Sequence, residues 1–282
     1  MIRFCRVLGL ALVLLSSRAM AQFGTEPAVL DLVRVTDDIY VIHNDFVPGN
    51  ITVLVTDDGV LLVDTKYALD YDNVAAMLAE ITDQPIRYVV NTHYHDDHSG
   101  ANAILQTGGA RVMASGNARR KMLDTGRSEG LPNVTIEDFV SVHIGDTRVD
   151  LYYFGRAHTD GDVVAHFPDH GVLAAGDIYA NDPGTPELVD YSGGGSAREW
   201  PLTLSRALEL DFEQVVPGHG TVVPKADMAG FRDETARLAE MVQSMNRAGR
   251  SREDIDAMLR SEFNFADFHI SSSLDGLLIE LQ

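Results

Sequence analysis

The residues best suited to chemistry lie in one short segment, His93 to His98. Four potential metal ligands, three histidines and Asp97, fall within its six residues in the pattern H-x-H-x-D-H. Imidazole and carboxylate groups at this density suit zinc or a similar divalent metal. The run Ile86–Val90 precedes them and predicts a buried strand, whose end would place the ligands at the edge of a sheet. A solvated polar loop is the alternative interpretation of this segment taken alone.

Three further potential ligands follow apolar runs elsewhere in the chain. They are His158, Asp177 and His219, and each has a glycine beside it or close by, which lets the backbone turn sharply and approach a ligand closely. With the first segment they form a set of seven: His93, His95, Asp97, His98, His158, Asp177 and His219. Seven ligands are too many for one tetrahedral ion, but they suit two ions that share a bridging ligand.

These motifs resemble those of the metallo-β-lactamase superfamily of binuclear hydrolases. Their order and spacing between residues 50 and 220 are specific to that pattern. The residues that carry the resemblance are Gly59–Thr65, a strand ending in Asp-Thr; the H-x-H-x-D-H segment followed by Ser99–Asn102; His158–Asp162; Ala175–Asp177; and Pro217–Gly220.

The resemblance divides the seven ligands between two ions, expected to be zinc, with iron or manganese as alternatives. It implies His93, His95 and His158 at the first ion and Asp97, His98 and His219 at the second, with Asp177 bridging both. A water held between two cations loses its proton near neutral pH, and this bridging hydroxide is the expected nucleophile. The catalytic carboxylates are then expected to be Asp97 and Asp177.

Other residues are expected to support the ligands or to touch the substrate. Asp64 and Asp162 are candidates to orient the imidazoles by hydrogen bonds, and the alternative for each is an ordinary carboxylate at a strand end. The substrate candidates are Phe46, in a loop of the kind that flanks the pocket in this superfamily, and Tyr179 and Asn181, which follow Asp177. Tyr179 or Asn181 could donate to an oxyanion, although Tyr179 packing under its loop is an equal alternative.

Alternating strands and helices predict the frame that positions these residues. Short apolar runs predict strands, while helical spacing predicts helices over Asp70–Thr82, Ser99–Leu105, Ala197–Leu210, Ala226–Arg247 and Ser273–Leu281. A layered α/β sandwich buries such elements, and the resemblance implies a four-layer αββα sandwich with two central mixed β-sheets. The ligand set straddles the one linker-like segment, Ser192–Ser196. We therefore expect a single hydrolase domain over residues 22–282, with helices at its C-terminus.

The first 21 residues are predicted to be a secretory signal peptide. Arg3 and Arg6 form a basic start, Val7–Leu15 is a short apolar core, and Ala19–Ala21 is a small-x-small cleavage site. The apolar core is too short to span a bilayer as a stable helix, so a membrane anchor is the less favoured alternative. The mature protein is therefore expected to be periplasmic or secreted, without membrane attachment.

Composition narrows the chemistry further. The only cysteine, Cys5, lies in the predicted signal, so the mature chain would have no disulfide, no thiolate nucleophile and no thiolate ligand. Many zinc β-lactamases place a cysteine at the second metal, and Asp177 corresponds to that region here. The formal charge of −20 becomes about −23 without the three arginines of the signal. Such a charge repels nucleic acid and anionic lipid.

The predicted activity is a dinuclear zinc-dependent hydrolysis of a small cyclic amide or ester, β-lactam-like or lactone-like. The sequence has no G-x-S-x-G, S-x-x-K or P-loop motif, which favours metal-activated water over a covalent intermediate. A thioester or phosphoester hydrolase of the same fold is an alternative, as is an iron persulfide dioxygenase, which the complete second ligand set disfavours. A non-enzymatic metal-binding protein is the third. The native substrate and the oligomeric state stay open.

Overall fold

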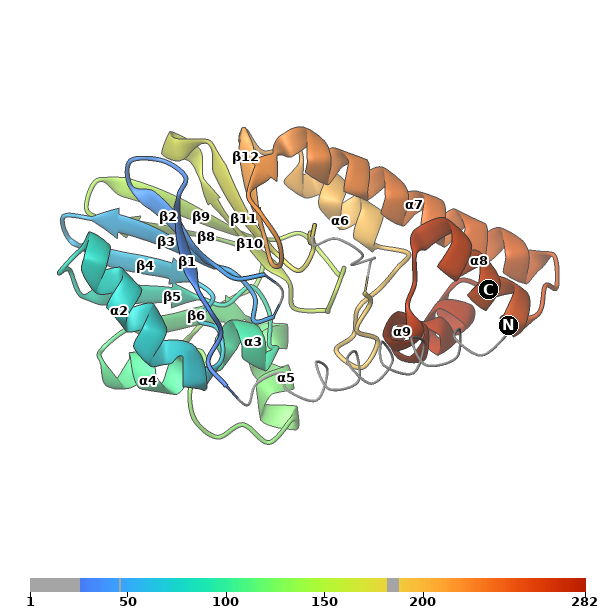
Figure 1. Ribbon diagram of the computed structural model, residues 1–282, viewed down its shortest axis with the longest axis horizontal. Helices are drawn as coiled ribbons and strands as arrows, with labels where there is room; N and C mark the ends of the chain where they lie inside the picture. The colour runs from blue at the N-terminus through green and yellow to red at the C-terminus, as the bar shows by residue number, and fades with distance from the viewer. Residues whose placement is uncertain (1–25, 46, 182–187) are drawn as a thin grey trace, which may run out of the picture.

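Two β-sheets packed face to face, with helices on both outer sides, form the frame of the protein (Figure 1). The computed structural model describes residues 26–45, 47–181 and 188–282. The predicted signal peptide and Phe46 lie outside these ranges. The arrangement confirms the expected αββα sandwich with two mixed sheets.

The first sheet has seven strands in the order in which they occur along the chain. The first four strands pair antiparallel, whereas the pairs from β4 to β7 are parallel. The strands are β1 (Asp31–Arg34), β2 (Ile39–His43), β3 (Ile51–Thr56), β4 (Gly59–Val63), β5 (Ile86–Val90), β6 (Arg111–Ser115) and β7 (Val134–Ile136). Because β4 and β5 are parallel, their carboxyl ends meet at the same edge of the sheet.

The second sheet has six strands in the order β13-β12-β11-β10-β9-β8. Only β11 and β12 pair in parallel, so their carboxyl ends also meet at one edge. The strands are β8 (Phe139–Ile144), β9 (Thr147–Tyr153), β10 (Val163–Phe167), β11 (Val172–Gly176), β12 (Gln214–Pro217) and β13 (Val223–Pro224).

Helices cover the two outer faces. Those on the side of the first sheet are α2 (Tyr71–Ile81) and α4 (Asn102–Thr107), and those after the second sheet are α6 (Trp200–Ala207), α7 (Lys225–Arg247), α8 (Arg252–Phe263) and α9 (Asp267–Glu280). The remaining helices are α3 (Asp96–Ser99), α5 (Gly116–Asp124) and two short 3₁₀ turns, η1 (Ala68–Asp70) and η2 (Pro168–His170). No helix in the described ranges is long and apolar enough to cross a membrane.

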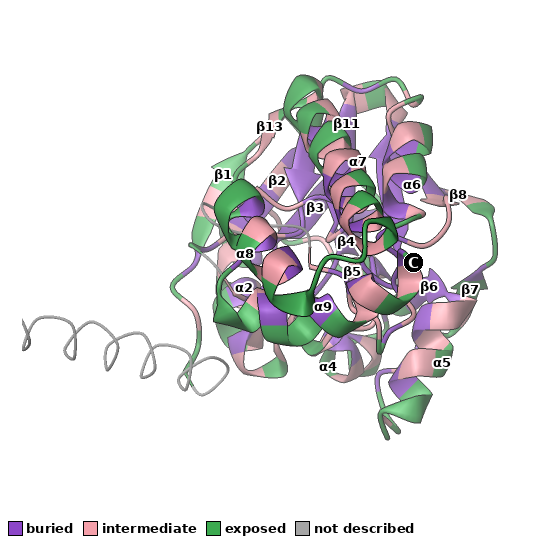
Figure 2. Ribbon diagram, turned by 90° about the vertical axis from the view of Figure 1, so that its right-hand side faces the viewer, coloured by how far each residue is buried: buried purple, intermediate pink, exposed green. Residues whose placement is uncertain are grey.

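Alternation of side chains along the strands builds three apolar layers. Figure 2 shows the central strands largely in the colour of buried residues. In β4, Leu61 and Val63 point between the sheets, while Val60 and Leu62 pack under α2 and α4. In β11, Val172 and Ala174 point into the layer between the sheets, while Leu173 and Ala175 pack under the helices α6 to α9. Both faces of central strands such as β4 and β11 are therefore buried, whereas the edge strands β1 and β8 keep exposed positions. At the centre of the sandwich, the strand ends and loops are left to carry polar chemistry.

Some predicted boundaries were wrong. The helix predicted over 99–105 is two short helices, and the first of them, α3, begins earlier, inside the ligand segment. The last helix begins at Asp267 rather than Ser273. The short strands β7 and β13 were not predicted, since three and two residues give too little periodicity to recognise.

Phe167 tests the middle layer. It is fully buried between the sheets, so Phe167→Ala is expected to lower the free energy of unfolding by about 3–5 kcal/mol. Phe139→Ala makes the same change at a ring that is 50% exposed and contacts Tyr152, and should cost at most about 1.5 kcal/mol. Urea unfolding of both variants at equal metal loading measures the difference; equal losses would contradict this packing.

Candidate metal centre

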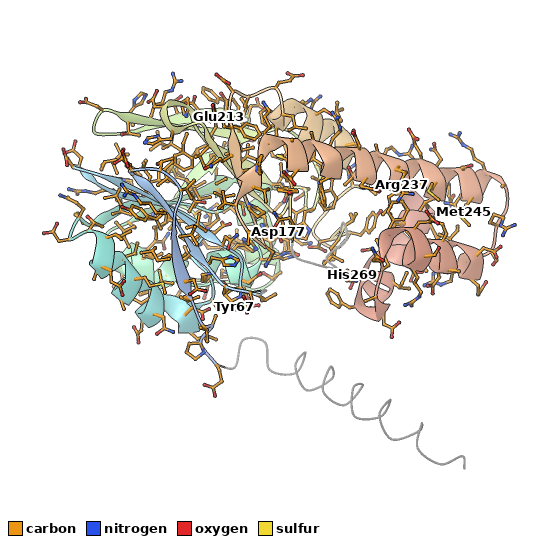
Figure 3. All side chains as sticks on the ribbon, turned by 45° about the horizontal axis from the view of Figure 1, so that its top comes forward. Tyr67, Asp177, Glu213, Arg237, Met245 and His269 are labelled. Carbon is orange, nitrogen blue, oxygen red and sulfur yellow. The ribbon has the colours of Figure 1, made fainter. Side chains whose placement is uncertain are left out.

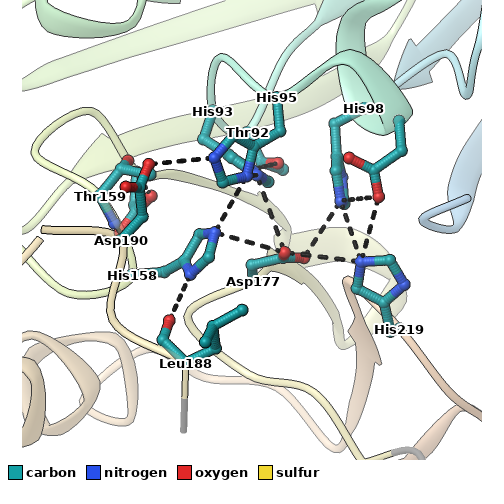
Figure 4. A network of polar contacts seen from close by, with 12 residues as sticks. Thr92, His93, His95, His98, His158, Thr159, Asp177, Leu188, Asp190 and His219 are labelled. Atoms are coloured by element: carbon teal, nitrogen blue, oxygen red, sulfur yellow. Dashed lines mark hydrogen bonds and ion pairs between the residues drawn. The ribbon is translucent and has the colours of Figure 1, made fainter. Parts of the chain in front are cut away.

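The structure brings all seven predicted ligands together at one edge of the sandwich (Figure 4). His93 and His95 lie in the turn after β5, and Asp97 and His98 lie on α3, which follows directly. The other three come from the second sheet: His158 from the turn between β9 and β10, Asp177 from the end of β11, and His219 from the turn after β12. The donor atoms form two groups, and within each group all lie within 4.8 Å of one another.

The first group contains His93, His95, His158 and Asp177. Nδ1 of His95 lies 2.9 Å from Nε2 of His93 and 3.1 Å from Nε2 of His158. Oδ2 of Asp177 lies 3.7 Å from Nε2 of His93 and 3.6 Å from Nε2 of His158. Three imidazole nitrogens and one carboxylate oxygen therefore face a common point.

The second group contains Asp97, His98 and His219. The two Nε2 atoms are 3.3 Å apart, and Oδ2 of Asp97 lies 3.5 Å from that of His98 and 3.4 Å from that of His219. Asp177 also reaches this group, since its Oδ1 lies 3.2 Å from Nε2 of His98 and its Oδ2 lies 3.5 Å from Nε2 of His219. Its carboxylate lies between the two groups in Figure 4.

Gly218 allows the loops that carry Asp177 and His219 to approach each other. A Cβ atom at Gly218 would lie 1.9 Å from Oδ1 of Asp177, closer than any side chain permits. The backbone nitrogen of Gly218 donates to the carbonyl of Gly176 at 2.9 Å. Glycine at this position thus lets a ligand from β11 and a ligand after β12 occupy one site.

Hydrogen bonds on the outer nitrogens fix how His93 and His98 face the site. Nδ1 of His98 lies 2.8 Å from Oδ2 of Asp64, a carboxylate that can only accept. Nδ1 of His93 lies 3.0 Å from the hydroxyl of Thr92, which itself donates to Asp64 at 2.8 Å and so accepts from the ring. In both histidines Nδ1 therefore donates away from the site and Nε2 points inward.

His95 and His158 are fixed in the same manner by the segment after residue 187. Nε2 of His95 donates to Oδ2 of Asp190 at 3.0 Å, which leaves the Nδ1 lone pair pointing inward. Nδ1 of His158 donates to the carbonyl of Leu188 at 2.6 Å, which frees Nε2. The hydrogen bonds from His95, Tyr94, Ser192 and the amide of Gly193 outweigh burial and hold the pKa of Asp190 well below its usual range.

The donor set of the first group fits a metal ion. Burial lowers the pKa values of His93 and His158, so both rings are neutral and their inward lone pairs face one another at close range. Such an arrangement is repulsive unless a cation lies between the nitrogens. Two donors on one tetrahedral ion with bonds of about 2.1 Å lie about 3.4 Å apart, close to the spacings found here.

The second group attracts positive charge through its carboxylates. Burial alone would lower the pKa values of His98 and His219. Asp177 and Asp97 act on both rings, and Asp64 acts on His98, so that these values rise to about 10 and about 9. The same field that holds protons on these rings favours a divalent cation in their place. Both groups therefore consist of residues that could hold a metal ion.

Asp64 lies where the sequence prediction places it, and Asp162 acts more indirectly. Burial raises the pKa of Asp64, while its bonds to His98 and Thr92 oppose this. Asp162 accepts from the backbone nitrogen of Thr159 at 2.9 Å and from its hydroxyl, and burial raises its pKa to about 7. Asp162 thus holds the turn beside His158 and acts on that ring through the backbone.

Residues that the sequence analysis missed hold the loop of His219. The side-chain nitrogen of Asn50 donates to the carbonyls of Pro217 at 3.0 Å and Gly220 at 2.9 Å. The preceding residue, Gly49, accepts a 2.8 Å bond from the ammonium of Lys66, which is completely buried. Burial lowers the pKa of Lys66 to about 7. A polar residue before a strand gives little sequence signal for such a distant contact.

The predicted substrate residues have other surroundings. Asn181 uses both amide atoms on the backbone of Thr221, at 2.8 and 2.9 Å, and so braces the His219 loop from the opposite side. Tyr179 is 2% exposed, and its ring packs edge-on against Phe231 at 5.2 Å, which is the packing alternative. Phe46 lies outside the described residues. Figure 3 places Asp177 near the middle of the molecule, between the sandwich and the C-terminal helices.

Comparison with known proteins agrees with this fold and site. The family model of the metallo-beta-lactamase superfamily matches residues 44–219. A metallo-beta-lactamase type 2 from Bacillus sp. (strain 170) is 25% identical over 65% of this chain and 71% of its own length. Metallo-beta-lactamase IND-1 from Chryseobacterium indologenes is 24% identical over 73% of this chain and 87% of its own length.

Solved structures share the fold. A metallo-beta-lactamase from Pontibacter korlensis has a TM-score of 0.65 at 22% identity, covering 73% of this chain and 99% of that one. DIM-1 metallo-beta-lactamase has a TM-score of 0.64 at 18% identity, covering 74% of this chain and 97% of that one. These likenesses establish the αββα architecture.

The match to the family model, the curated relatives and the paired His/Asp clusters together identify a metal-dependent hydrolase. The chain belongs to the metallo-β-lactamase superfamily, whose family model covers more than half of it.

Asp64→Asn tests the shared support of the two groups. An asparagine presents a donor where either Thr92 or His98 needs an acceptor, so metal affinity is expected to fall about 10–100-fold. Titration against a competing chelator measures the affinity, with Asp57→Asn, an exposed turn residue, as the matched control. Affinity equal to that of the parent would show that Asp64 does not orient the ligands.

Proposed function

We propose that this chain is an exported hydrolase that binds two zinc ions and opens a small cyclic amide or ester, a β-lactam or a lactone. One observation carries the proposal. Oδ2 of Asp177 lies 3.5 to 3.7 Å from nitrogens of His93, His158 and His219, so a single carboxylate faces both donor groups. A carboxylate that faces both donor groups can bridge two adjacent ions.

The assignment of ligands follows the two groups. His93, His95 and His158 would hold the first ion, Asp97, His98 and His219 the second, and Asp177 would bridge them. Bound zinc supplies Lewis acidity, which polarises a carbonyl group and lowers the pKa of coordinated water to about 7. Nitrogen and oxygen donors suit zinc, and the carboxylates leave iron or manganese as alternatives.

Residues around the donor groups fix the orientation of the imidazole rings. Asp64, Thr92 and Asp190 hold three imidazoles in the tautomer that turns a lone pair inward, so no reorganisation is needed when the reaction begins. No side-chain nucleophile is needed, which agrees with a chain whose one cysteine lies in the predicted signal peptide. The proposal that the protein is exported is based on the same predicted signal peptide.

The substrate class rests on two arguments. The relatives are named metallo-beta-lactamases, which makes a β-lactam the first probe at 24–25% identity. The second donor group is built from a carboxylate and imidazoles without a thiolate, unlike many zinc β-lactamases, which favours a lactone as the second probe. Thioesters and phosphoesters are the alternative substrates of the same site.

Metal analysis with a hydrolysis panel tests the proposal. The purified protein without residues 1–21 is expected to contain two zinc ions per chain and to hydrolyse a β-lactam or a lactone faster than a thioester or a phosphodiester. Chelation should abolish turnover, and added zinc should restore it. One bound iron with oxygen consumption on a persulfide would contradict the proposal, and so would full metal loading with no hydrolysis of any probe.

Asp97→Ala separates the two ions. The variant removes the only carboxylate that belongs to the second group alone, so zinc content should fall toward one per chain and kcat by about 100-fold or more. Asp124→Ala, at an exposed carboxylate at the end of α5, is the control. Turnover in Asp97→Ala equal to that of the parent would exclude a two-ion reaction.

A further inference from the structure

The segment 188–197, here called the support loop, bonds to two histidines of the first donor group. The carbonyl of Leu188 accepts from Nδ1 of His158 at 2.6 Å, and Asp190 accepts from Nε2 of His95 at 3.0 Å. The backbone nitrogen of Asp190 also donates to the carbonyl of His158 at 2.9 Å. The position of this loop therefore sets the orientation of both rings.

Hydrogen bonds within the support loop fix Asp190 relative to the rest of the loop. Oδ1 of Asp190 accepts from the amide of Gly193 at 2.9 Å, and its carbonyl accepts from the amide of Gly195 at 2.9 Å. The next residue, Ser196, donates its amide to the carbonyl of Ala157 at 2.9 Å. A displacement at residues 191–197 is thus carried to the carboxylate that orients His95.

Glu280, near the end of α9, holds the far side of this loop. One oxygen accepts from the hydroxyl of Tyr191 and from the amide of Ala197, both at 2.9 Å, while the other accepts from the hydroxyl of Ser196. Burial, and then the Glu280 carboxylate, raise the pKa of Tyr191, so that its hydroxyl stays a donor. A single carboxylate thereby joins the C-terminal helix to three loop residues.

The packing of α9 against the loop is close. A Cβ atom at Gly276 would lie 2.0 Å from the ring of Tyr191, so position 276 accepts only glycine while the ring stays in place. Leu277 and Leu281 of the same helix region belong to the apolar layer against which Tyr191 packs. The contact is therefore both apolar and charged. The helix that makes this contact lies beyond the segment matched by the family model, which ends at residue 219.

We propose that Glu280 is a positioning residue of the first metal site, acting through Tyr191 and the support loop on His95 and His158. The C-terminal helices then set metal affinity as well as completing the fold. This inference rests on the proposed function, because it takes the first donor group to be a zinc site.

Glu280→Gln tests the inference. The glutamine keeps one acceptor oxygen but has an NH₂ group in place of the other. This NH₂ group would face a hydroxyl or amide donor of the support loop, so at least one hydrogen bond is lost. Zinc titration of metal-free protein against a chelating dye should show about tenfold weaker binding at one of the two sites, the lower end of the effect of losing a direct partner of a ligand. Glu240→Gln, at an exposed position of α7, makes the same chemical change and should bind as the parent does.

Tyr191→Phe removes only the hydroxyl that Glu280 accepts, and provides a second test that does not disturb α9. It should weaken the same site, and the double variant should lose less than the two single losses combined. The visible spectrum of the Co²⁺-loaded protein should change in both single variants, whereas a purely structural role would lower the melting temperature and leave that spectrum unchanged. Should Glu280→Gln not fold, Tyr191→Phe carries the comparison alone.

The outcomes separate the two ideas. A parent protein that binds no metal contradicts the proposed function. A parent that binds two zinc ions, with equal affinities in Glu280→Gln, Tyr191→Phe and Glu240→Gln, contradicts only the role of Glu280. An equal loss at both sites overturns that role as well, because the bonds described above join the support loop to His95 and His158 of the first group.

Discussion

The buried carboxylate of Asp64 is the contact on which the order of the site depends. It lies at the end of β4 and accepts from the amide and hydroxyl of Thr92 and from Nδ1 of His98, each at 2.8 Å. Burying a charge is unfavourable, and these three donors offset that cost. Asp64 joins the ends of two parallel strands and orients one imidazole in each donor group, directly for His98 and through Thr92 for His93.

The seven candidate ligands could be recognised in the sequence because their signal is local. Each follows or continues a recognisable buried run, and parallel strands bring their carboxyl ends to one edge, so short motifs such as Ala175–Asp177 were enough to collect the seven donors. The alternation of strands and helices predicted a layered α/β sandwich, and the family resemblance implied its αββα form. Helix α3 began earlier than predicted because its only sequence signal is the ligand segment itself, which has the composition of a loop.

Unlike Asp64, the supporting residues Asp190, Asn50 and Lys66 could not be predicted, because their roles arise from contacts between distant parts of the chain. Asp190 bonds to His95 across 95 positions, and Asn50 reaches Pro217 across 167. Asn181 looked like a substrate contact since it follows Asp177, but its amide pairs with backbone that only the folded chain brings near. Nothing in the sequence near Lys66 indicates that its ammonium bonds to the carbonyl of Gly49. Periodicity predicts which residues are buried, but not which polar groups meet.

Each donor group draws members from both halves of the sandwich, the first from the turns after β5, β9 and β11, and the second from α3 and the turn after β12. An ion held in either group would therefore link the two sheets, which otherwise contact each other through apolar packing. The unfolded chain cannot gather these donors, so ion binding adds directly to the free energy of unfolding. For a protein exported as proposed, resistance to external proteases would then depend on the local supply of metal, and metal scarcity would shorten the protein's lifetime as well as lower its turnover.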